Sequence, residues 1–411
     1  MQITKENLIQ LDKTDPLRNF RKKFHVPEGF VYFDGNSLGV LPEITKERMQ
    51  EVIEHEWGEG LINSWLTGWG DAPKRIGDKI ATLIGADSGE VIAADSTSIN
   101  IFKVVVAALQ ANPTRKVVLS DSDNFPTDLY MLQGLESFAP DKIKVKITES
   151  FDIDNQLNEE VSALLLTEVH YKTGLITNMK EVTKKAHEVG ALVIWDLSHS
   201  IGSIPIDLNG CEADFAIGCG YKFLNGGPGA PGFLFAAKKH HESSKPILSG
   251  WFGHREPFAF SGEYISAEDI NQFQCGTPPV LGLAALECGV DLLCNVDFED
   301  LRFKSKKLGT ILISLMKDMC NMHGFTLISP QNDEKRAGHV SFSHEKGYEI
   351  SRALKSRGII CDFRTPDVIR FGITPLYLRY QDIYYAVEQI KIVMESADWR
   401  KEEYLVRDSY T

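Results

Sequence analysis

The sequence predicts an α/β protein with a large domain on a mainly parallel, doubly wound sheet and a smaller α+β domain after it. Strand and helix patterns alternate from residue 73 onward, which is typical of βαβ units. Two strand patterns, ALVIWDL and ADFAIGCG, are almost continuously apolar, as expected for strands buried on both faces. Around residues 280–325 the pattern changes to long helices. A chain of 411 residues exceeds one typical core, so we expect two domains.

We expect the N-terminal region to form a segment that packs with the small domain. Residues 1–30 have a helical pattern, and VYFDGNSLGVLP reads as a strand that a Gly-Asn turn breaks and Pro42 ends. Residues 43–57 have apolar side chains at helical spacing, whereas WGEGLINSWLTGWG fits neither helix nor strand. We therefore divide the chain into residues 1–56, a large domain at 57–295 and a small domain at 296–411.

The large domain is expected to alternate helices and strands up to ADFAIGCG. Its expected helices are KRIGDKIATLIGA, STSINIFKVVVAALQANP and TNMKEVTKKAHEVG, the last closed by Gly190. Its other expected strands are GEVIAAD, KVVLSDS, IKVKITE and VSALLLTEV. Later elements are the helices LGLAALECGVDLL and FKSKKLGTILISLMKDMC, the strands AGHVSFSHE and GIICDFR, and the helix QDIYYAVEQIKIVMESA.

Composition excludes several classes of function. The formal charge of −13 argues against nucleic acid or an anionic membrane as the main partner. No apolar run is long enough to span a bilayer, and the N-terminus has no signal core. Seven cysteines without a CxxC pair are typical of a reducing compartment, so we expect a cytoplasmic protein. No residues have zinc-ligand spacing, and we expect no metal.

An acid and a lysine follow neighbouring strands of the predicted sheet. Asp196 ends one strand, with His199 in the following loop, and Lys222 follows the next strand 222 − 196 = 26 residues later. Both should reach the carboxyl edge of the sheet, where ligands bind. This pair suits pyridoxal phosphate (PLP), with Lys222 attached to the aldehyde and Asp196 facing the pyridine nitrogen. An ordinary salt bridge is the alternative interpretation of the pair.

Three further segments at the same edge carry candidate cofactor ligands. Ser-Thr-Ser at 96–98, at the start of a helix, favours an anion site that includes Thr97 and Ser98, although a simple helix cap is the commoner use. Phe125 and Asp128 follow another strand and could cover and face a planar ring, or form only a turn and a cap. Thr167 ends the strand after that one.

The remaining candidates lie around and after Lys222. Tyr221 is suited to a phosphate contact or to proton transfer. Trp251 can donate its indole N–H to a phosphate or serve as a core aromatic, and Thr277 stands just before an expected proline-initiated helix. Arg370 lies in an apolar strand, where it needs a carboxylate from either the substrate or the protein.

Together these motifs resemble the kynureninase family, a branch of the fold-type-I PLP enzymes related to class V aminotransferases. The resemblance covers residues 30–380 in the expected order. Its motifs are YFDGNSLG, WGEGLINSW, FPTD, VIWDLSHSIG, GYKFLNGGPG, SGWFGH, GTPPV and VIRFGITPLY.

The resemblance implies a hydrolase of tryptophan catabolism and pyridine nucleotide biosynthesis. It would convert L-kynurenine or 3-hydroxykynurenine to anthranilate or 3-hydroxyanthranilate and L-alanine. Lys222 and Tyr221 would be catalytic, and Ser37, Trp65 and Arg370 would contact the substrate. The implied cofactor residues are Thr97, Ser98, Phe125, Asp128, Thr167, Asp196, His199, Tyr221, Lys222, Trp251 and Thr277. The family likeness also implies a homodimer in which Thr277 comes from the other subunit, and this chain has Thr277 where some relatives have Asn.

The sequence leaves three alternative functions open. A cysteine desulfurase or selenocysteine lyase would need a mobile thiol, whereas Cys361 reads as a strand residue. A class V aminotransferase shares the fold and the lysine. A non-catalytic dimeric scaffold is disfavoured because Lys222, Asp196 and Arg370 are all present.

Overall fold

The computed structural model describes residues 3–407, and the chain divides into two compact units. The large unit consists of Thr45–Glu168 and Thr177–Asn295. The small unit consists of the residues up to Ile44, of Val169–Ile176 and of the residues from Val296 onward. The three-part division expected from the sequence, with borders after residues 56 and 295, stays a prediction.

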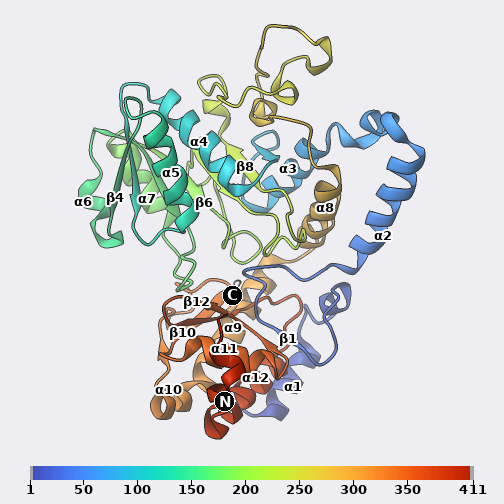
Figure 1. The fold of residues 1–411 in the computed structure, drawn as a ribbon, viewed down its shortest axis with the longest axis vertical. Helices are drawn as coiled ribbons and strands as arrows, with labels where there is room; N and C mark the ends of the chain where they lie inside the picture. The colour runs from blue at the N-terminus through green and yellow to red at the C-terminus, as the bar shows by residue number, and fades with distance from the viewer. Residues whose placement is uncertain (1–2, 408–411) are drawn as a thin grey trace. The chain divides into compact units, whose positions relative to one another are not determined.

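Within the described residues, the large unit contains a seven-stranded sheet (Figure 1) in the order β2-β8-β7-β6-β5-β3-β4. Strands β7, β6, β5, β3 and β4 run parallel to one another. Strand β8 is antiparallel to its neighbours β2 and β7. The α/β fold with a mainly parallel sheet is therefore confirmed. The strands are β2 (Val91–Ala93), β3 (Val117–Asp121), β4 (Lys144–Thr148), β5 (Val161–Thr167), β6 (Leu192–Asp196), β7 (Phe215–Gly218) and β8 (Phe233–Ala236).

Helices cover both faces of this sheet. Ile194 of β6 belongs to a buried apolar cluster that includes side chains of α4 and α5, which lie beside the sheet in Figure 1. The next residue, Trp195, donates its Nε1–H to Thr183 Oγ1 of α7 at 3.2 Å. Because successive strand residues point to opposite faces, α7 lies across the sheet from α4 and α5. The α-helices of this unit are α3 (Ala72–Leu83), α4 (Thr97–Ala111), α5 (Pro126–Phe138), α6 (Ile153–Gln156), α7 (Met179–Glu188) and α8 (Val280–Cys294).

The ends of α4 and α7 follow local sequence signals. Ser96 Oγ accepts a hydrogen bond from Ile99 N at 3.4 Å, and Asn178 caps α7 in the same way. Gly190 has φ +77°, so it ends α7 in the left-handed region where glycine has no steric cost. The predicted helix end at Gly190 is confirmed.

The segment after residue 43 is helical but irregular. The expected helix at 43–57 consists of α2 (Glu43–Glu51) and a π-helical stretch, η2 (Val52–Glu59). The segment WGEGLINSWLTGWG at residues 57–70, called the Trp-rich segment below, continues as η3 (Leu61–Asn63) and η4 (Trp65–Trp69). The other short helices are η1 (Phe20–Lys23), η5 (Ser150–Asp152), η6 (Lys238–His240), η7 (Trp251–Gly253), η8 (Pro257–Ala259), η9 (Ile270–Phe273) and η10 (Asp398–Arg400).

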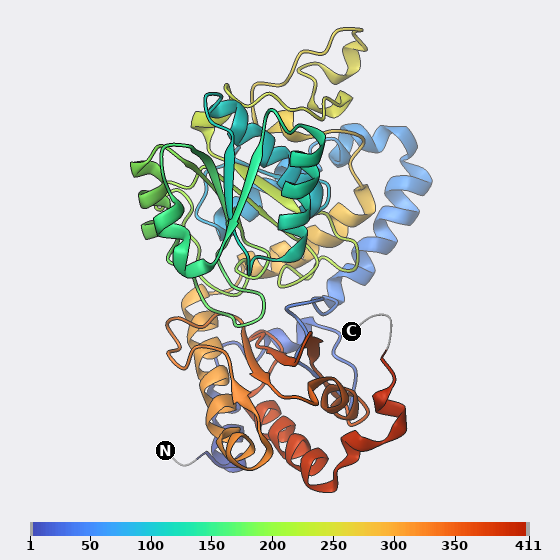
Figure 2. The same cartoon turned by 60° about the vertical axis from the view of Figure 1, so that its left-hand side comes forward.

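The small unit combines an antiparallel sheet in the order β12-β13-β10-β9 with a parallel β1-β11 pair. Figure 2 shows α9 and α12 side by side in this unit. The strand expected across VYFDGNSLGVLP is only two residues long. The elements are α1 (Lys5–Thr14), β1 (Val31–Tyr32), α9 (Phe298–Leu315), α10 (Lys317–His323), β9 (Thr326–Leu327), β10 (His339–Ser343), α11 (Gly347–Lys355), β11 (Ile359–Ile360), β12 (Asp362–Arg364), β13 (Val368–Gly372), α12 (Tyr380–Ser396) and α13 (Glu402–Leu405).

Among the helices of residues 3–407, none has both the length and the apolar character needed to cross a membrane. In the same residues, the His, Cys, Asp and Glu side chains form no group of three or more that could hold a metal ion.

Candidate active site

The carboxyl edge of the large sheet brings several predicted site residues together. Asp196, the last residue of β6, lies beside Thr167, the last residue of β5, in the parallel register. Lys222 lies in the loop that follows β7, the next strand of the sheet. The strand and crossover spacing therefore places the acid and the lysine at one edge, as the sequence predicted.

Lys222 is buried and lies among polar and aromatic groups. Its Nζ is 3.0 Å from His199 Nε2. The same nitrogen is 5.6 Å from the ring centre of Phe125 and 5.9 Å from that of Tyr221. The Lys222 side chain thus has an aromatic and imidazole environment with little access to water, which suits an amine that must react with an aldehyde.

Helix α8 packs closely against the loop that carries Lys222. A Cβ at Gly289 of α8 would lie 1.9 Å from the carbonyl oxygen of Leu224. Glycine at this position therefore permits the close contact between helix and loop.

Two buried carboxyl groups lie beside this lysine. Asp196 Oδ1 accepts a hydrogen bond from Ser198 N at 2.7 Å. Both carboxyl oxygens of Asp128 are buried without a hydrogen-bond donor. Burial and the charge of Asp196 raise the pKa of Asp128, and burial also raises the pKa of Asp196. The site thus contains two carboxyl groups for one lysine, an arrangement that a further cation would complete.

Asn124, which was not predicted from the sequence, connects two of the predicted residues, Phe125 and Thr167. Its Oδ1 accepts hydrogen bonds from Phe125 N, at 2.9 Å, and from Thr167 Oγ1. Its Nδ2 donates to Ser120 Oγ at 3.3 Å. Asn124 fixes the start of α5, which carries Phe125 and Asp128. Its position after a strand and before Phe-Pro was the available signal.

The Ser-Thr-Ser segment provides both a helix cap and a free hydroxyl. Ser96 acts as the cap of α4, whereas Thr97 Oγ1 is buried without a hydrogen-bond partner and Ser98 is half-buried. Lys103 of α4 donates to Asp95 and, at 2.5 Å, to the carbonyl oxygen of Phe273. These bonds hold the loop before α4 in place.

Trp251 and Thr277 are exposed in this chain. The Trp251 side chain packs edge-on against Phe252 and Phe258 and is 40 % exposed. Thr277 is exposed, and the expected helix after it begins only at Val280 with Pro279 as its cap. A proline therefore stands at the start of the helix that follows Thr277, as the cap rather than as the first helical residue.

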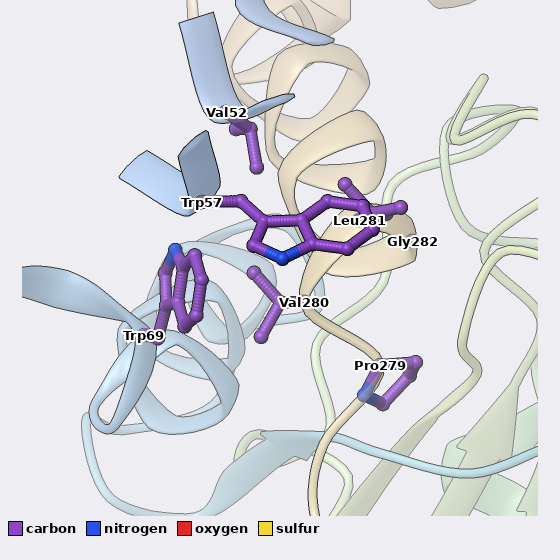
Figure 3. A pocket seen from close by; sticks show the side chains of 7 residues that line it. All are labelled: Val52, Trp57, Trp69, Pro279, Val280, Leu281 and Gly282. Carbon is purple, nitrogen blue, oxygen red and sulfur yellow. The ribbon is translucent and has the colours of Figure 1, made fainter. Parts of the chain in front are cut away.

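Among the cavities that border the Trp-rich segment, two have volumes of about 400 Å³ or more. Trp65 lines one of about 510 Å³ together with Phe252, and their ring centres are 5.6 Å apart. The other cavity, of about 400 Å³ (Figure 3), is apolar and was not predicted. Its lining residues are Val52, Trp57, Trp69, Pro279, Val280, Leu281 and Gly282.

In the small unit, Arg370 of β13 is fully buried and forms a two-point ion pair with Asp362 of β12. Its Nη1 donates to the carbonyl oxygen of Tyr171 at 2.6 Å, and its Nη2 donates to Ser37 Oγ at 3.1 Å. The structural ion pair considered for Arg370 is therefore present. Asp362 was not predicted because it comes to lie opposite Arg370 only when β12 and β13 are paired.

The large-unit site fits PLP in three respects. A protonated pyridine nitrogen would supply the missing positive charge beside Asp128 and Asp196. The hydroxyl of Thr97 and the N-terminus of α4 would suit the phosphate. The lysine needed for the covalent attachment is buried beside an aromatic ring.

Comparison with known proteins decides the family. The chain is 42% identical to a kynureninase of Burkholderia pseudomallei over 99% of this chain and all of that protein. The chain belongs to the kynureninase family. A kynureninase of Pseudomonas fluorescens matches to the same extent, and residues 301–390 match the kynureninase C-terminal domain.

Solved structures show that the chain shares its fold with a wider group of proteins. A cysteine desulfurase from Thermococcus onnurineus aligns with a TM-score of 0.78 over 92% of this chain and 98% of that one, at 18% identity. The cysteine desulfurase CsdA from Escherichia coli aligns with a TM-score of 0.77 over the same shares of the two chains, also at 18% identity. At this identity the likeness shows the fold, which agrees with the predicted PLP fold type I.

Proposed function

We infer that this protein hydrolyses L-kynurenine to anthranilate and L-alanine, with PLP as its cofactor. The observation that carries this conclusion is the 42% identity to kynureninases over 99% of the chain. The activity makes the protein a PLP-dependent hydrolase of tryptophan catabolism.

When bound, PLP draws electrons from the amino-acid substrate and so eases the loss of the α-proton. We propose that Lys222 holds the cofactor and moves this proton at its Nζ. The burial of Lys222 and its 3.0 Å contact with His199 support this role, because both restrict the amine to one position.

The two carboxyl groups are proposed to have different tasks. Asp196 holds a proton on the pyridine nitrogen, and its backbone bond from Ser198 keeps the carboxylate oriented. Asp128 adds a second carboxyl group, and its donor-free oxygens leave it available to the cofactor. Phe125 is proposed to stack on one side of the ring, with Thr167 on the other.

The proposed phosphate ligands come from several segments. Thr97, Ser98 and Tyr221 belong to one chain, together with Trp251. Thr277 is proposed to come from the partner subunit of a homodimer, and its exposure in the single chain supports that assignment. Light scattering of the purified protein tests the dimer, since a monomer at working concentration would contradict it.

The substrate is proposed to lie among Ser37, Trp65 and Arg370. Trp65 offers an aromatic face for the aryl ring, and Arg370 offers positive charge for the α-carboxylate. Tyr221 is the proposed acid that protonates the alanine product, since its ring lies 5.9 Å from Lys222 Nζ.

The rival desulfurase chemistry lacks support from its candidate thiol. Burial and the nearby Asp362 raise the pKa of Cys361, which keeps the thiol protonated and poorly nucleophilic. The prediction of a cytoplasmic protein remains a proposal that rests on seven cysteines, all of them free.

The test is product analysis with the PLP-loaded protein. L-Kynurenine and 3-hydroxy-L-kynurenine are supplied in parallel, and anthranilate fluorescence and alanine are measured. We expect both products in equal amounts from kynurenine, and the ratio of kcat/KM values gives the preference between the two substrates. Sulfide release from cysteine without any anthranilate, or transfer of the amino group to a keto acid, would contradict the proposal.

A further inference from the structure

Two arginines of the small unit converge on one carboxylate. Arg370 and Arg364 both direct Nη2 toward Asp362 Oδ2, and the Arg364 contact is 2.8 Å. Ser37 Oγ lies 3.1 Å from Arg370 Nη2 and 3.3 Å from Arg364 Nη2, and it donates to Asp362 Oδ2 at 2.8 Å. We call these four residues the arginine cluster.

Strand register creates this cluster. Asp362 lies directly opposite Arg370 in the antiparallel β12-β13 pair. Arg364 is two residues after Asp362 and therefore projects from the same face of β12. The two guanidinium groups are consequently neighbours despite their like charge.

The hydrogen bonds of Arg370 leave it few free donors. A guanidinium has five N–H groups. Nε donates to Asp362, Nη2 donates to Asp362 and Ser37, and Nη1 donates to the carbonyl of Tyr171. One N–H on Nη1 remains, so Arg370 alone cannot offer a carboxylate a two-point contact without losing one of these bonds.

Arg364 is more exposed than Arg370 and has a donor atom without an acceptor. Its Nε is buried without a hydrogen-bond acceptor, while its side chain as a whole is 29% exposed. An unsatisfied buried N–H is unfavourable unless a ligand completes it. Arg364 therefore combines a donor without a partner with a side chain that an incoming molecule can reach.

The charges of the cluster also do not balance. Two guanidinium groups face the single carboxylate of Asp362. The nearest further acid is Asp34, whose pKa burial and Asp362 raise to about 7, so it is only partly ionised at neutral pH. A surplus of positive charge remains in a largely buried place, and a monoanionic ligand would neutralise it.

We propose that Arg364 binds the α-carboxylate of the amino-acid substrate together with Arg370. In this arrangement Arg370 supplies its remaining N–H and Arg364 supplies the second contact, while Asp362 and Ser37 keep the two groups in place. This inference rests on the proposed function, because it is the proposed substrate role of Arg370 that brings a carboxylate to the cluster.

The test uses ligands with and without a carboxylate. The PLP-loaded protein is titrated with L-alanine and with L-alaninamide, and the change in cofactor absorbance gives the half-saturating concentration of each. Arg364→Met is compared with the wild-type protein and with Arg357→Met. Arg357 is a matched control, because it has similar exposure in the same unit and pairs with Asp398 at 3.4 Å.

Arg364→Met should raise the half-saturating L-alanine concentration at least tenfold and that of L-alaninamide less than twofold. The KM for kynurenine should rise by a similar factor with kcat changed less than threefold, and Arg364→Lys should recover part of the loss. Arg357→Met should leave all of these values unchanged. The absorbance of the cofactor without ligand should be the same in every variant.

Equal weakening of L-alanine and L-alaninamide binding would overturn the proposal, since it would mean that Arg364 supports the structure alone. Unchanged L-alanine binding in Arg364→Met would overturn it too. If that variant does not fold, Arg364→Gln and Arg364→Lys give the same comparison. L-Alanine binding is measured without aryl substrate, so a failure of kynurenine hydrolysis in the wild-type protein is a separate result.

Discussion

The buried polar groups of the two units differ in how completely they are satisfied. In the large unit, Asp128 has no hydrogen-bond donor on either carboxyl oxygen, and two acids share one lysine. In the small unit, Asp362 has donors on both carboxyl oxygens and faces two guanidinium groups. The large-unit site therefore has an excess of hydrogen-bond acceptors, and the arginine cluster of the small unit has an excess of positive charge.

This difference indicates which kind of ligand would complete each of the two sites. Buried polar groups without partners are costly, so they remain in a fold where a ligand completes them. The large-unit site would be completed by a cationic ring, and the small-unit site by an anion. A pyridinium ring suits the first need and a substrate carboxylate the second, in line with the roles proposed for Asp196 and Arg370.

The largest expected effect comes from Lys222→Ala. The proposed covalent attachment and the proton transfer at Nζ would both be lost, so kcat should fall by about 10⁴-fold or more. Anthranilate fluorescence measures the rate, and the absorbance of the bound cofactor should shift. Lys185→Ala removes a surface ion pair with Asp154 and should leave both unchanged. Near-normal turnover in Lys222→Ala would show that the reacting centre is elsewhere.

Asp362→Asn tests whether the small-unit cluster depends on its own acid. The change leaves two guanidinium groups without their carboxylate, and breaking such a buried pair costs about 3–5 kcal/mol. The free energy of unfolding in urea should fall by this amount, with a higher KM for kynurenine. Asp398→Asn, a control that removes a more exposed partner of Arg357, should cost about 1 kcal/mol or less. Equal losses in the two variants would remove the contrast.

Glu168 is another buried acid of the large unit, next to Thr167, and it allows a test by pH. Burial raises the pKa of Glu168 to about 7, whereas the unfolded chain has the ordinary value near 4.5. Stability from this group is therefore present below pH 4.5 and lost as pH rises through 7. Relative to the wild type, Glu168→Gln should gain about 3 kcal/mol between pH 4.5 and 8.

Urea unfolding at several pH values measures this gain. Glu188→Gln, at an exposed ion pair with Lys184, should show no such trend. A constant difference between Glu168→Gln and the wild type across this pH range would contradict the raised pKa.

The smallest effect is expected for Asp128→Asn without cofactor. Burial and Asp196 raise the pKa of Asp128, so its ionisation above that pKa destabilises the empty site. An Asn amide cannot ionise and can donate toward Asp196, which should raise the unfolding free energy at pH 8 by about 1–2 kcal/mol. Cofactor affinity should fall in the same variant. A variant less stable than the wild type without cofactor would contradict the idea that this site lacks a partner.

The sequence predicted the sheet and the placement of Asp196, Thr167 and Lys222 at one of its edges, because both depend on local patterns. Apolar runs locate β5, β6 and β7, and parallel strands must present their carboxyl ends at one edge. Asp196 and Lys222 were therefore expected to meet. Strand β8 was missed because it is a four-residue apolar run after a glycine-rich turn, with no alternation to mark it.

By itself, the sequence determined the fold class, the helix ends such as Gly190 and the family to which the chain belongs. The tertiary structure decided which polar groups find partners. Arg370 and Ser37 are 333 residues apart, and Thr167 and Asn124 are 43 apart, yet each pair forms a hydrogen bond. Periodicity is a property of neighbouring residues, whereas such contacts arise only when distant strands are paired, so the partners of Arg370 and the unsatisfied Arg364 could be seen only in the folded chain.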